Sequence, residues 1–366
     1  MPRKKAYYYM RNNMLGTEKM GKNGGFIRYI TVCFICLLIY VTGIYKGFAD
    51  AKISTANPKF AEIEEHQTEE ITTQVEIKQT EEKKEEKGEE KSTSSVAASS
   101  PEVYKGRVIS RYISPYTAKL CYGKVYMKNS TGLDIDIKKL LNSKISFKIK
   151  KNDEPQVLIV HTHTSETFMK QESDVYTESF SSRTQDKKYN MVMIGKIVAK
   201  KLNSAGIKTL HDETIHDYPE YNGSYSKSAA TIKKYLKKYP SIKVVLDLHR
   251  DAISSGDTDK VKLVTEIKGE KAAQVMLVMG SQSGSVTNFP NWQENLKLAL
   301  RVQAKIEEKY PTLARPLSLV SRNYNESLTK GSMLIEFGTD VNTIDEVSRS
   351  AEYVGDALSL VLGELK

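Results

Sequence analysis

A buried strand that runs straight into histidine and glutamate is the feature that most restricts what this chain can fold into. Residues 157–160 are Val-Leu-Ile-Val, four apolar residues of which three are β-branched, so they predict a buried strand. His161, His163 and Glu166 follow within six residues. Ligands of α/β proteins bind outside the carboxyl ends of the strands, so this stretch predicts a functional site at one edge of a sheet.

Two later stretches repeat this arrangement. Residues 243–248 form a second apolar strand that carries Asp247 and leads into His249. Residues 333–337 form a third, which carries Glu336 before Gly338 closes it. Strands that alternate with helices build a mostly parallel sheet with helices on both faces. We therefore expect an α/β fold in which three strands bring these side chains to one place.

The periodicity of apolar residues predicts the remaining elements of the α/β fold. Helical spacing recurs over residues 191–205, 226–239, 292–309 and 343–362. We expect one further strand at 207–210, and a hairpin of 261–267 with 274–279 around Gly269.

The polar residues at these strand ends suit a catalytic zinc site. His163 and Glu166 stand at His-x-x-Glu spacing, and His249 would be the third protein ligand, which leaves one position open for water. The three cysteines, at positions 33, 36 and 121, all precede this half of the chain, so a metal here must be held by His and carboxylate. Glu336 is the candidate to take the proton of that water.

The same residues would also be compatible with satisfied polar groups in a core. Glu336 favours the metal site, because a buried carboxylate costs several kcal/mol unless it has a partner or a task. We expect His161 to support the ligands rather than bind the metal, and Asp247 to orient an imidazole. His211 and His216 are expected at the surface. No Gly-x-Ser-x-Gly elbow and no Gly-rich phosphate loop is present, which disfavours a serine nucleophile and nucleotide chemistry.

The N-terminal part of the chain predicts export. Residues 1–28 are polar and basic, and residues 29–45 are uncharged and long enough to span a bilayer at the short end of the usual range. The positive-inside rule places the basic tail in the cytoplasm and everything after Lys46 outside. A cleaved signal peptide, with Ala49-Asp-Ala51 as its cleavage site, is the alternative to a retained anchor.

Two segments of opposite charge precede the catalytic half. Residues 46–102 are rich in Glu, Lys, Thr and Ser, so we expect a disordered linker. Residues 103–154 form either a small basic module or an extension of the domain that follows, and within 103–151 twelve Lys/Arg stand against Asp134 and Asp136. Tyrosines among lysines suit an anionic surface such as a wall polymer or membrane headgroups, and no nucleic-acid motif is present.

Residues from about Val157 to the C-terminus resemble the stage II sporulation protein P family. The resemblance is specific and the motifs keep their order along the chain. They are His161-Thr-His-Thr-Ser-Glu166, Leu246-Asp-Leu-His-Arg-Asp-Ala252, Asn291-Trp292 with Asn295, Arg322-Asn-Tyr-Asn325, and Leu334-Ile-Glu-Phe-Gly338 with Asn342-Thr343. The site motifs are more distantly similar to zinc-dependent N-acetylmuramoyl-L-alanine amidases and to metallocarboxypeptidases.

The resemblance implies a zinc-dependent peptidoglycan hydrolase of sporulation engulfment, with residues 155–366 as its catalytic amidase domain. The enzyme would cut the bond between N-acetylmuramic acid and L-alanine, with stem-peptide cross-links as a second target. Implied partners are the membrane and the stage II sporulation proteins D and M. Arg250, Arg322 and Asn323 are the expected substrate-binding residues, because guanidinium groups clamp carboxylates.

Three alternatives stay open at this point. Ordinary amidases place the glutamate ligand further from the first histidine, which makes Glu178 the second candidate after Glu166. The chain could be a wall-binding scaffold on an inactive amidase fold, or a metallocarboxypeptidase that clips stem peptides. The presence of all four site residues disfavours the inactive scaffold.

Overall fold

The computed structural model describes residues 103–365 of the chain. The predicted cytoplasmic tail (1–28), membrane anchor (29–45) and charged linker (46–102) lie outside the described residues. Among residues 103–365, no helix has both the length and the apolar character needed to cross a bilayer.

An eight-stranded sheet forms the centre of the described region. Its strands in spatial order are β2 (Leu120–Tyr122), β3 (Val125–Asn129), β12 (Leu317–Val320), β11 (Val275–Gly280), β13 (Met333–Thr339), β7 (Val244–Asp251), β4 (Val157–Val160) and β6 (Thr209–His211). The pairs β2–β3 and β11–β13 are antiparallel, and the other neighbours run parallel. The predicted α/β class is confirmed, with a sheet that is mostly but not purely parallel.

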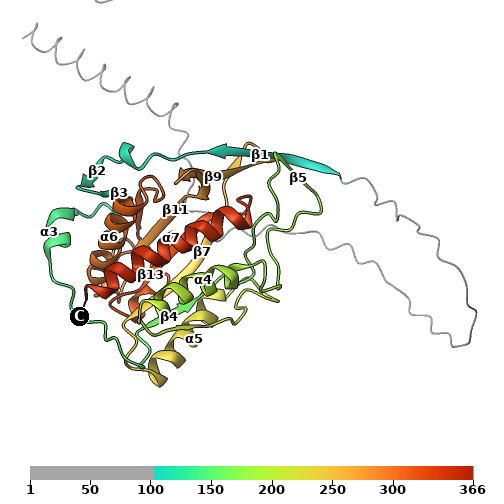
Figure 1. The fold of residues 1–366 in the computed structure, drawn as a ribbon. Coiled ribbons are helices and arrows are strands. Elements are labelled where there is room, and N and C mark those ends of the chain that lie inside the picture. The colour runs from blue at the N-terminus through green and yellow to red at the C-terminus, as the bar shows by residue number, and fades with distance from the viewer. Residues whose placement is uncertain (1–102, 366) are drawn as a thin grey trace, which may run out of the picture. The chain divides into compact units, whose positions relative to one another are not determined.

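Helices cover both faces of this sheet, but unequally. Alternation along β4 shows why: Val157 and Ile159 belong to the large core, whereas Leu158 and Val160 pack with Ile232 in a smaller cluster. The large core is closed by α4 (Met191–Ser204), α6 (Trp292–Lys309) and α7 (Ile344–Gly363), and the smaller cluster by α5 (Ser224–Lys238). Figure 1 shows α7 and α4 lying side by side across the strands.

We refer to the side of the sheet on which α5 packs as the α5 face. Every one of the four predicted helices is present, and their ends lie within two residues of the predicted ones. The helical period is therefore a reliable guide in this chain, because apolar residues repeat along one side of each helix.

The predicted hairpin of 261–267 with 274–279 is wrong. Strand β9 (Asp259–Ile267) turns at Lys268 and Gly269, both with positive φ, into β10 (Glu270–Ala273), which pairs with it. Residues 275–280 instead form β11 of the central sheet, antiparallel to β13. Strand β9 belongs to a second sheet, whose other members are β10, β1 (Tyr104–Arg111), β5 (Val175–Thr177) and β8 (Ser254–Ser255).

The basic region 103–154 contributes to both sheets. Strand β3 pairs with β12 in the central sheet, and β1 pairs with β9 in the second. The short helix α3 (Ile137–Asn142) begins where the Asp136 side chain accepts a hydrogen bond from the backbone of Lys139. Because Val125, Met127, Ile135 and Ile137 are also buried in the large core, this region shares the core of the domain that follows.

A glycine on α4 allows that helix to approach the end of β4. A Cβ atom on Gly195 would lie 2.2 Å from His211 Nε2 and 2.7 Å from His161 Nε2, which is too close for real contacts. We expect Gly195→Ala to lower the free energy of unfolding by about 1–3 kcal/mol, the usual cost of overpacking. Denaturant midpoints measure this change.

Gly363, at the end of α7, is the matched control for this prediction, because a Cβ there meets open space. Gly363→Ala should be neutral or stabilising by up to about 1 kcal/mol, since alanine is the better helix former. Equal midpoints for wild type and Gly195→Ala would contradict the packing described here.

Candidate functional site

Strand alternation and register place three acidic and basic side chains together on the α5 face. Leu246 and Leu248 of β7 point into the large core, so Asp247 and His249 point to the opposite side. Strand β13 runs parallel to β7, and its Glu336 is the register partner of His249. The neighbours of Glu336, Ile335 and Phe337, fill the large core, so its carboxylate also lies on the α5 face.

The turn after β4 adds His163 and Glu166 to this position. The imidazole rings of His163 and His249 lie edge to face with centroids 5.3 Å apart. Glu166 Oε2 lies 3.8 Å from His249 Nδ1 and accepts a hydrogen bond of 3.1 Å from the backbone N–H of Arg250. We call His163, Glu166, His249 and Glu336 the strand-end cluster. The structure thus brings together four residues that sequence spacing alone predicts as one site.

His249 lies in a strongly negative environment. Desolvation lowers the pKa of its imidazole, but three carboxylates act in the opposite direction: Asp247, with Oδ1 at 2.9 Å from Nε2, and then Glu166 and Glu336. Together they raise the pKa of His249 to about 10. Asp247 is itself fixed by the Thr162 backbone N–H at 2.8 Å and hydroxyl at 2.6 Å. The position next to Asp247 therefore favours a positive charge and holds the imidazole in one orientation.

Glu336 is the carboxylate of the cluster that the protein compensates least. Burial is the main cause of its raised pKa of about 8, and the nearby carboxylates of Asp251 and Glu166 also raise it. The attraction of His249 acts in the opposite direction. Its Oε2 atom is shielded from solvent and has no hydrogen-bond partner among residues 103–365. A carboxyl group in this state is able both to accept and to return a proton near neutral pH.

The donor set of the cluster has the chemistry that zinc takes, two imidazoles and a carboxylate. Within the part of the chain that the structure describes, no three His, Cys, Asp or Glu side chains converge as a formed metal site. The negative charge around His249 and the shielded Oε2 of Glu336 are both features that a nearby cation would offset. The residues therefore fit a zinc ion in donor type and in charge.

Three tyrosines that sequence periodicity does not identify surround the cluster. The Tyr221 ring stacks on His163 at 4.6 Å between centroids, and its hydroxyl lies 3.2 Å from His163 Nε2. Tyr225, in the first turn of α5, lies 5.6 Å from the His163 ring and 6.5 Å from that of His249. Tyr324 lies 5.7 Å from Tyr225. Since Tyr221 is 40% exposed, the cluster lies directly beneath an accessible aromatic side chain.

An arginine and an aspartate fix the turn that carries Glu166. Asp217 accepts hydrogen bonds from the Ser165 backbone at 3.0 Å and from Arg183 Nη1 at 2.5 Å. The Arg183 guanidinium also lies 4.6 Å above the Tyr221 ring, with Nη2 at 3.8 Å from Glu166 Oε1. Arg183 therefore links Glu166 to the tyrosine that covers His163.

The predicted substrate-binding residues occupy different environments. Arg250 is buried, and its guanidinium donates to the backbone carbonyls of Thr167 and Ser182 at 3.1 and 2.7 Å, so in this structure it ties the loop after β4 to β7. Arg322 is exposed on the loop after β12, and the side chain of Asn323 accepts from the backbone of Ser327 at 3.2 Å. Substrate binding by these residues stays a prediction.

His161 does not contact the strand-end cluster through its side chain but contacts the backbone next to His249. Strand β4 ends at Val160, and His161 lies on the α4 side of the sheet, away from the α5 face. Its Nε2 contacts His211 Nε2 at 2.8 Å and its Nδ1 the carbonyl of Leu248 at 3.0 Å. Desolvation, with the neighbouring His211, lowers the pKa of His161 to about 3. His161 is thus a neutral core histidine that contacts the backbone just before His249.

The expectation that His216 lies at the surface is wrong, and His211 is half-buried. The loop after β6 folds back onto the end of β4, where His216 is buried between the His161 carbonyl, at 2.8 Å from Nδ1, and the Thr231 hydroxyl, at 2.9 Å from Nε2. Polar flanking residues suggested exposure, but they are satisfied inside the fold. Glu178, the second candidate ligand, is exposed in the turn after β5, whereas Glu166 lies beside His249.

Comparison with known proteins identifies the family of the chain. The family model described as Stage II sporulation protein P (SpoIIP) matches residues 39–359. The chain belongs to the stage II sporulation protein P family. The curated Stage II sporulation protein P of Bacillus subtilis (strain 168) is 29% identical in an alignment of 223 residues that covers 57% of this chain and 51% of that protein. This member of the family therefore spans about half the length of the curated relative it matches.

Solved structures with similar folds include two amidases. The N-acetylmuramoyl-L-alanine amidase AmiC2 of Nostoc punctiforme is 12% identical with a TM-score of 0.34, covering 57% of this chain and 96% of that one. The CwlD amidase from Clostridioides difficile, in complex with the GerS lipoprotein, is 10% identical with a TM-score of 0.36, covering 57% and 98%.

A buried carboxyl near the cluster yields a prediction about pH. Glu326 holds the loop after β12, since its Oε2 accepts from the Gly280 N–H at 2.9 Å, and burial raises its pKa well above the ordinary value of 4.5. The folded state then keeps a proton that the unfolded state releases. The free energy of unfolding should therefore fall as pH rises from about 4.5 toward the folded pKa, by up to about 1.4 kcal/mol per pH unit.

Glu326→Gln keeps the shape and removes the ionisation, so we expect a shallower slope, with only the part due to Glu326 lost, and a stability near pH 7 that equals or exceeds that of wild type. Urea unfolding between about pH 5 and pH 8 measures the difference. Glu266→Gln, at an exposed position on β9, is the control for the loss of one carboxyl group. Parallel pH curves for wild type and Glu326→Gln would refute the prediction.

Proposed function

We propose that this protein is a zinc-dependent peptidoglycan hydrolase that cleaves the amide bond between N-acetylmuramic acid and L-alanine during sporulation engulfment. The observation that carries the proposal is the strand-end cluster, in which Glu336 and His249 are register partners on neighbouring strands and Glu166 lies 3.8 Å from His249. Membership of the stage II sporulation protein P family supports the biological setting. Stem-peptide cross-links are the second bond that we propose for the same site.

His163, Glu166 and His249 would hold the zinc ion. Bound there, zinc would supply Lewis acidity toward the carbonyl of the scissile amide. Asp247 keeps the His249 ring in one orientation, and the Arg250 backbone N–H fixes the Glu166 carboxylate. These contacts keep the donor atoms in place before substrate arrives, which is the usual function of groups that contact ligands from behind.

Glu336 would move the protons of the hydrolysis. Its pKa of about 8 lies near the working range of a general base. Its shielded Oε2 atom has no hydrogen-bond donor among the described residues that would compete for it. The carboxylate would take a proton from the attacking water and deliver it to the nitrogen of the leaving amine. Tyr221 and Tyr225 would limit the access of bulk water to this transfer.

Two substitutions separate the two carboxylates of the cluster. Glu336→Gln removes the basicity but not a ligand, so we expect zinc content near wild type and a loss of hydrolysis of about a hundredfold to ten-thousandfold. Glu166→Gln should lose zinc together with activity. Elemental analysis and release of soluble fragments from purified sacculi measure both quantities, and chelation followed by added zinc should abolish and restore wild-type activity.

The assignment is wrong if Glu336→Gln releases fragments at a rate comparable to wild type, since another residue would then move the proton. Loss of zinc from Glu336→Gln would make Glu336 a ligand instead.

We further propose that the catalytic domain lies outside the cytoplasm, held by the anchor at residues 29–45 and working with the stage II sporulation proteins D and M. The support is the basic flank before the uncharged stretch and the anionic, extracytoplasmic substrate. A reporter that is active only outside the cytoplasm, fused after Lys366, should be active. Activity of a cytoplasm-only reporter at the same position would overturn the topology. Mature protein that begins near Asp50 would show that the anchor is cleaved.

A further inference from the structure

Helix α5 presents a dense row of positive charge to solvent. The helix contains no acidic residue, and its apolar residue Ile232, with Tyr235 and Leu236 beside it, packs onto β4 and β7. The exposed side of α5 consists largely of lysines, namely Lys227, Lys233, Lys234, Lys237 and Lys238. We call these five residues the α5 lysine row.

Several lysines of the helices on the other face of the sheet have carboxylate partners, unlike the five of this row. Lys201 of α4 pairs with Glu352 at 2.5 Å, and Lys297 of α6 pairs with Glu294 at 2.5 Å. Among the described residues, none of the row has a carboxylate within 4.0 Å: Lys227 donates to the Glu220 carbonyl, and Lys238 lies over the Tyr239 ring.

Folding alone gives no reason for the positive charges at Lys233 and Lys234. Lys233 and Lys237, and likewise Lys234 and Lys238, stand four residues apart on one helix, where like charges destabilise. An acid at Lys233 or Lys234 would pair with the lysine four residues later, whereas Lys237 and Lys238 lie in the last turn, where the helix dipole favours positive charge. A charge arrangement that opposes helix stability is consistent with a requirement for binding something anionic.

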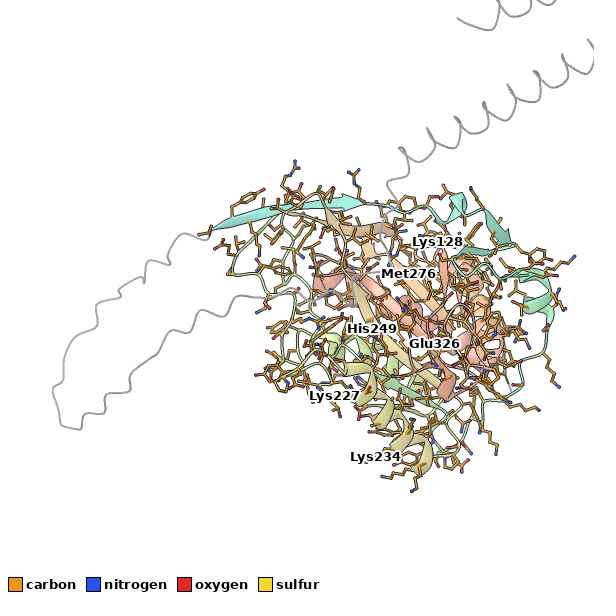
Figure 2. The ribbon with its side chains drawn as sticks, turned by 180° about the vertical axis from the view of Figure 1, so that it is seen from behind. Lys128, Lys227, Lys234, His249, Met276 and Glu326 are labelled. Atoms are coloured by element: carbon orange, nitrogen blue, oxygen red, sulfur yellow. The ribbon has the colours of Figure 1, made fainter. Side chains whose placement is uncertain are left out.

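The row leads away from the strand-end cluster. Tyr225, in the first turn of α5, lies 6.5 Å from the His249 ring, and the lysines begin two residues later. Figure 2 shows that Lys227 and then Lys234 follow one another along α5 in the direction that leads away from His249. At 1.5 Å per residue, the helix extends about 20 Å from Tyr225 to Lys238.

We propose that the α5 lysine row binds the carboxylates of uncleaved stem peptides on a glycan strand, so that a strand held along α5 has its next amide at the cluster. This proposal rests on the proposed function and names how its substrate is bound. The continuity of the row with the cluster through Tyr225 favours an extended polymer over a lipid surface, because a planar bilayer does not extend into the site.

Binding without cleavage tests the row separately from catalysis. In the Glu336→Gln background, we would compare the triple variant Lys233→Gln, Lys234→Gln, Lys237→Gln with its parent, by co-sedimentation with purified peptidoglycan sacculi at low and at raised salt. The control is Lys139→Gln, Lys200→Gln, Lys309→Gln, which removes three exposed lysines from α3, α4 and α6. Unfolding midpoints of all variants check that each protein is folded.

We expect the α5 triple variant to bind sacculi about tenfold more weakly at low salt, as the loss of three surface ion pairs of ordinary strength predicts, and to lose most of the salt dependence. The control should bind within about twofold of the parent. Equal losses in both triple variants, or no loss in either, would overturn the proposal. The proposal would also be overturned if the α5 triple variant lost binding only to phosphatidylglycerol vesicles and not to sacculi, because the row would then be a membrane contact.

Sacculus binding in the Glu336→Gln background does not depend on hydrolysis, so the proposed function and the lysine row can fail independently. If the wild-type protein does not hydrolyse peptidoglycan but the α5 triple variant loses sacculus binding, the proposed function fails and the row is still a polymer-binding surface. If the wild-type protein is active but the α5 triple variant binds sacculi as well as its parent, only the proposed role of the lysine row fails.

Discussion

The register between β7 and β13 is the constraint on which the candidate site depends. Parallel pairing sets Glu336 opposite His249, and the two-residue alternation of each strand sends both side chains to the α5 face. On the other side, Leu248 and Phe337 fill the large core. A slip of one residue would bury the ionisable groups against α4, α6 and α7 and expose apolar ones, so the core itself enforces the register of the site.

The fold compensates most of the charge that this register concentrates. Thr162 donates twice to Asp247, the Arg250 backbone donates to Glu166, and Arg183 links Glu166 to Asp217. Without such partners each buried charge would cost several kcal/mol. Glu336 receives least of this support, which is why its pKa is raised and why its carboxyl group is the one suited to exchange protons.

The sequence predicts the strand ends and the helices well, because both follow from strong local periodicity. The runs at 157–160, 243–248 and 333–337 are buried strands of the expected sheet, and the four helices end where their apolar stripes end. It predicts poorly whatever depends on distant contacts. The turn at Gly269 is a true hairpin signal, but β10 is too short and too polar at its start to be recognised, so β11 was expected in its place.

Distant contacts also explain the errors within the site. Tyr221 and Tyr225 contact His163 from a loop and from the first turn of α5, and Tyr324 reaches Tyr225 from a second loop. Single residues in such places leave no periodic signal. His216 sits in a polar loop whose burial depends on the carbonyl of His161, fifty-five residues earlier. Region 103–154 alternates too weakly to reveal that β3 pairs with β12. In that pairing Met127 is the register partner of Leu317, almost two hundred residues later in the chain.

The unequal cover of the two faces has a consequence for how the molecule opens. Three helices and most of the apolar side chains lie on one side, whereas α5 closes a cluster of only five fully buried hydrophobic residues. Local opening is least costly where few apolar contacts are lost, so α5 and the loops around Tyr221 and Tyr324 can loosen while the large core stays closed. If the proposed function holds, a bulky polymer would enter and leave this side of the sheet without global unfolding.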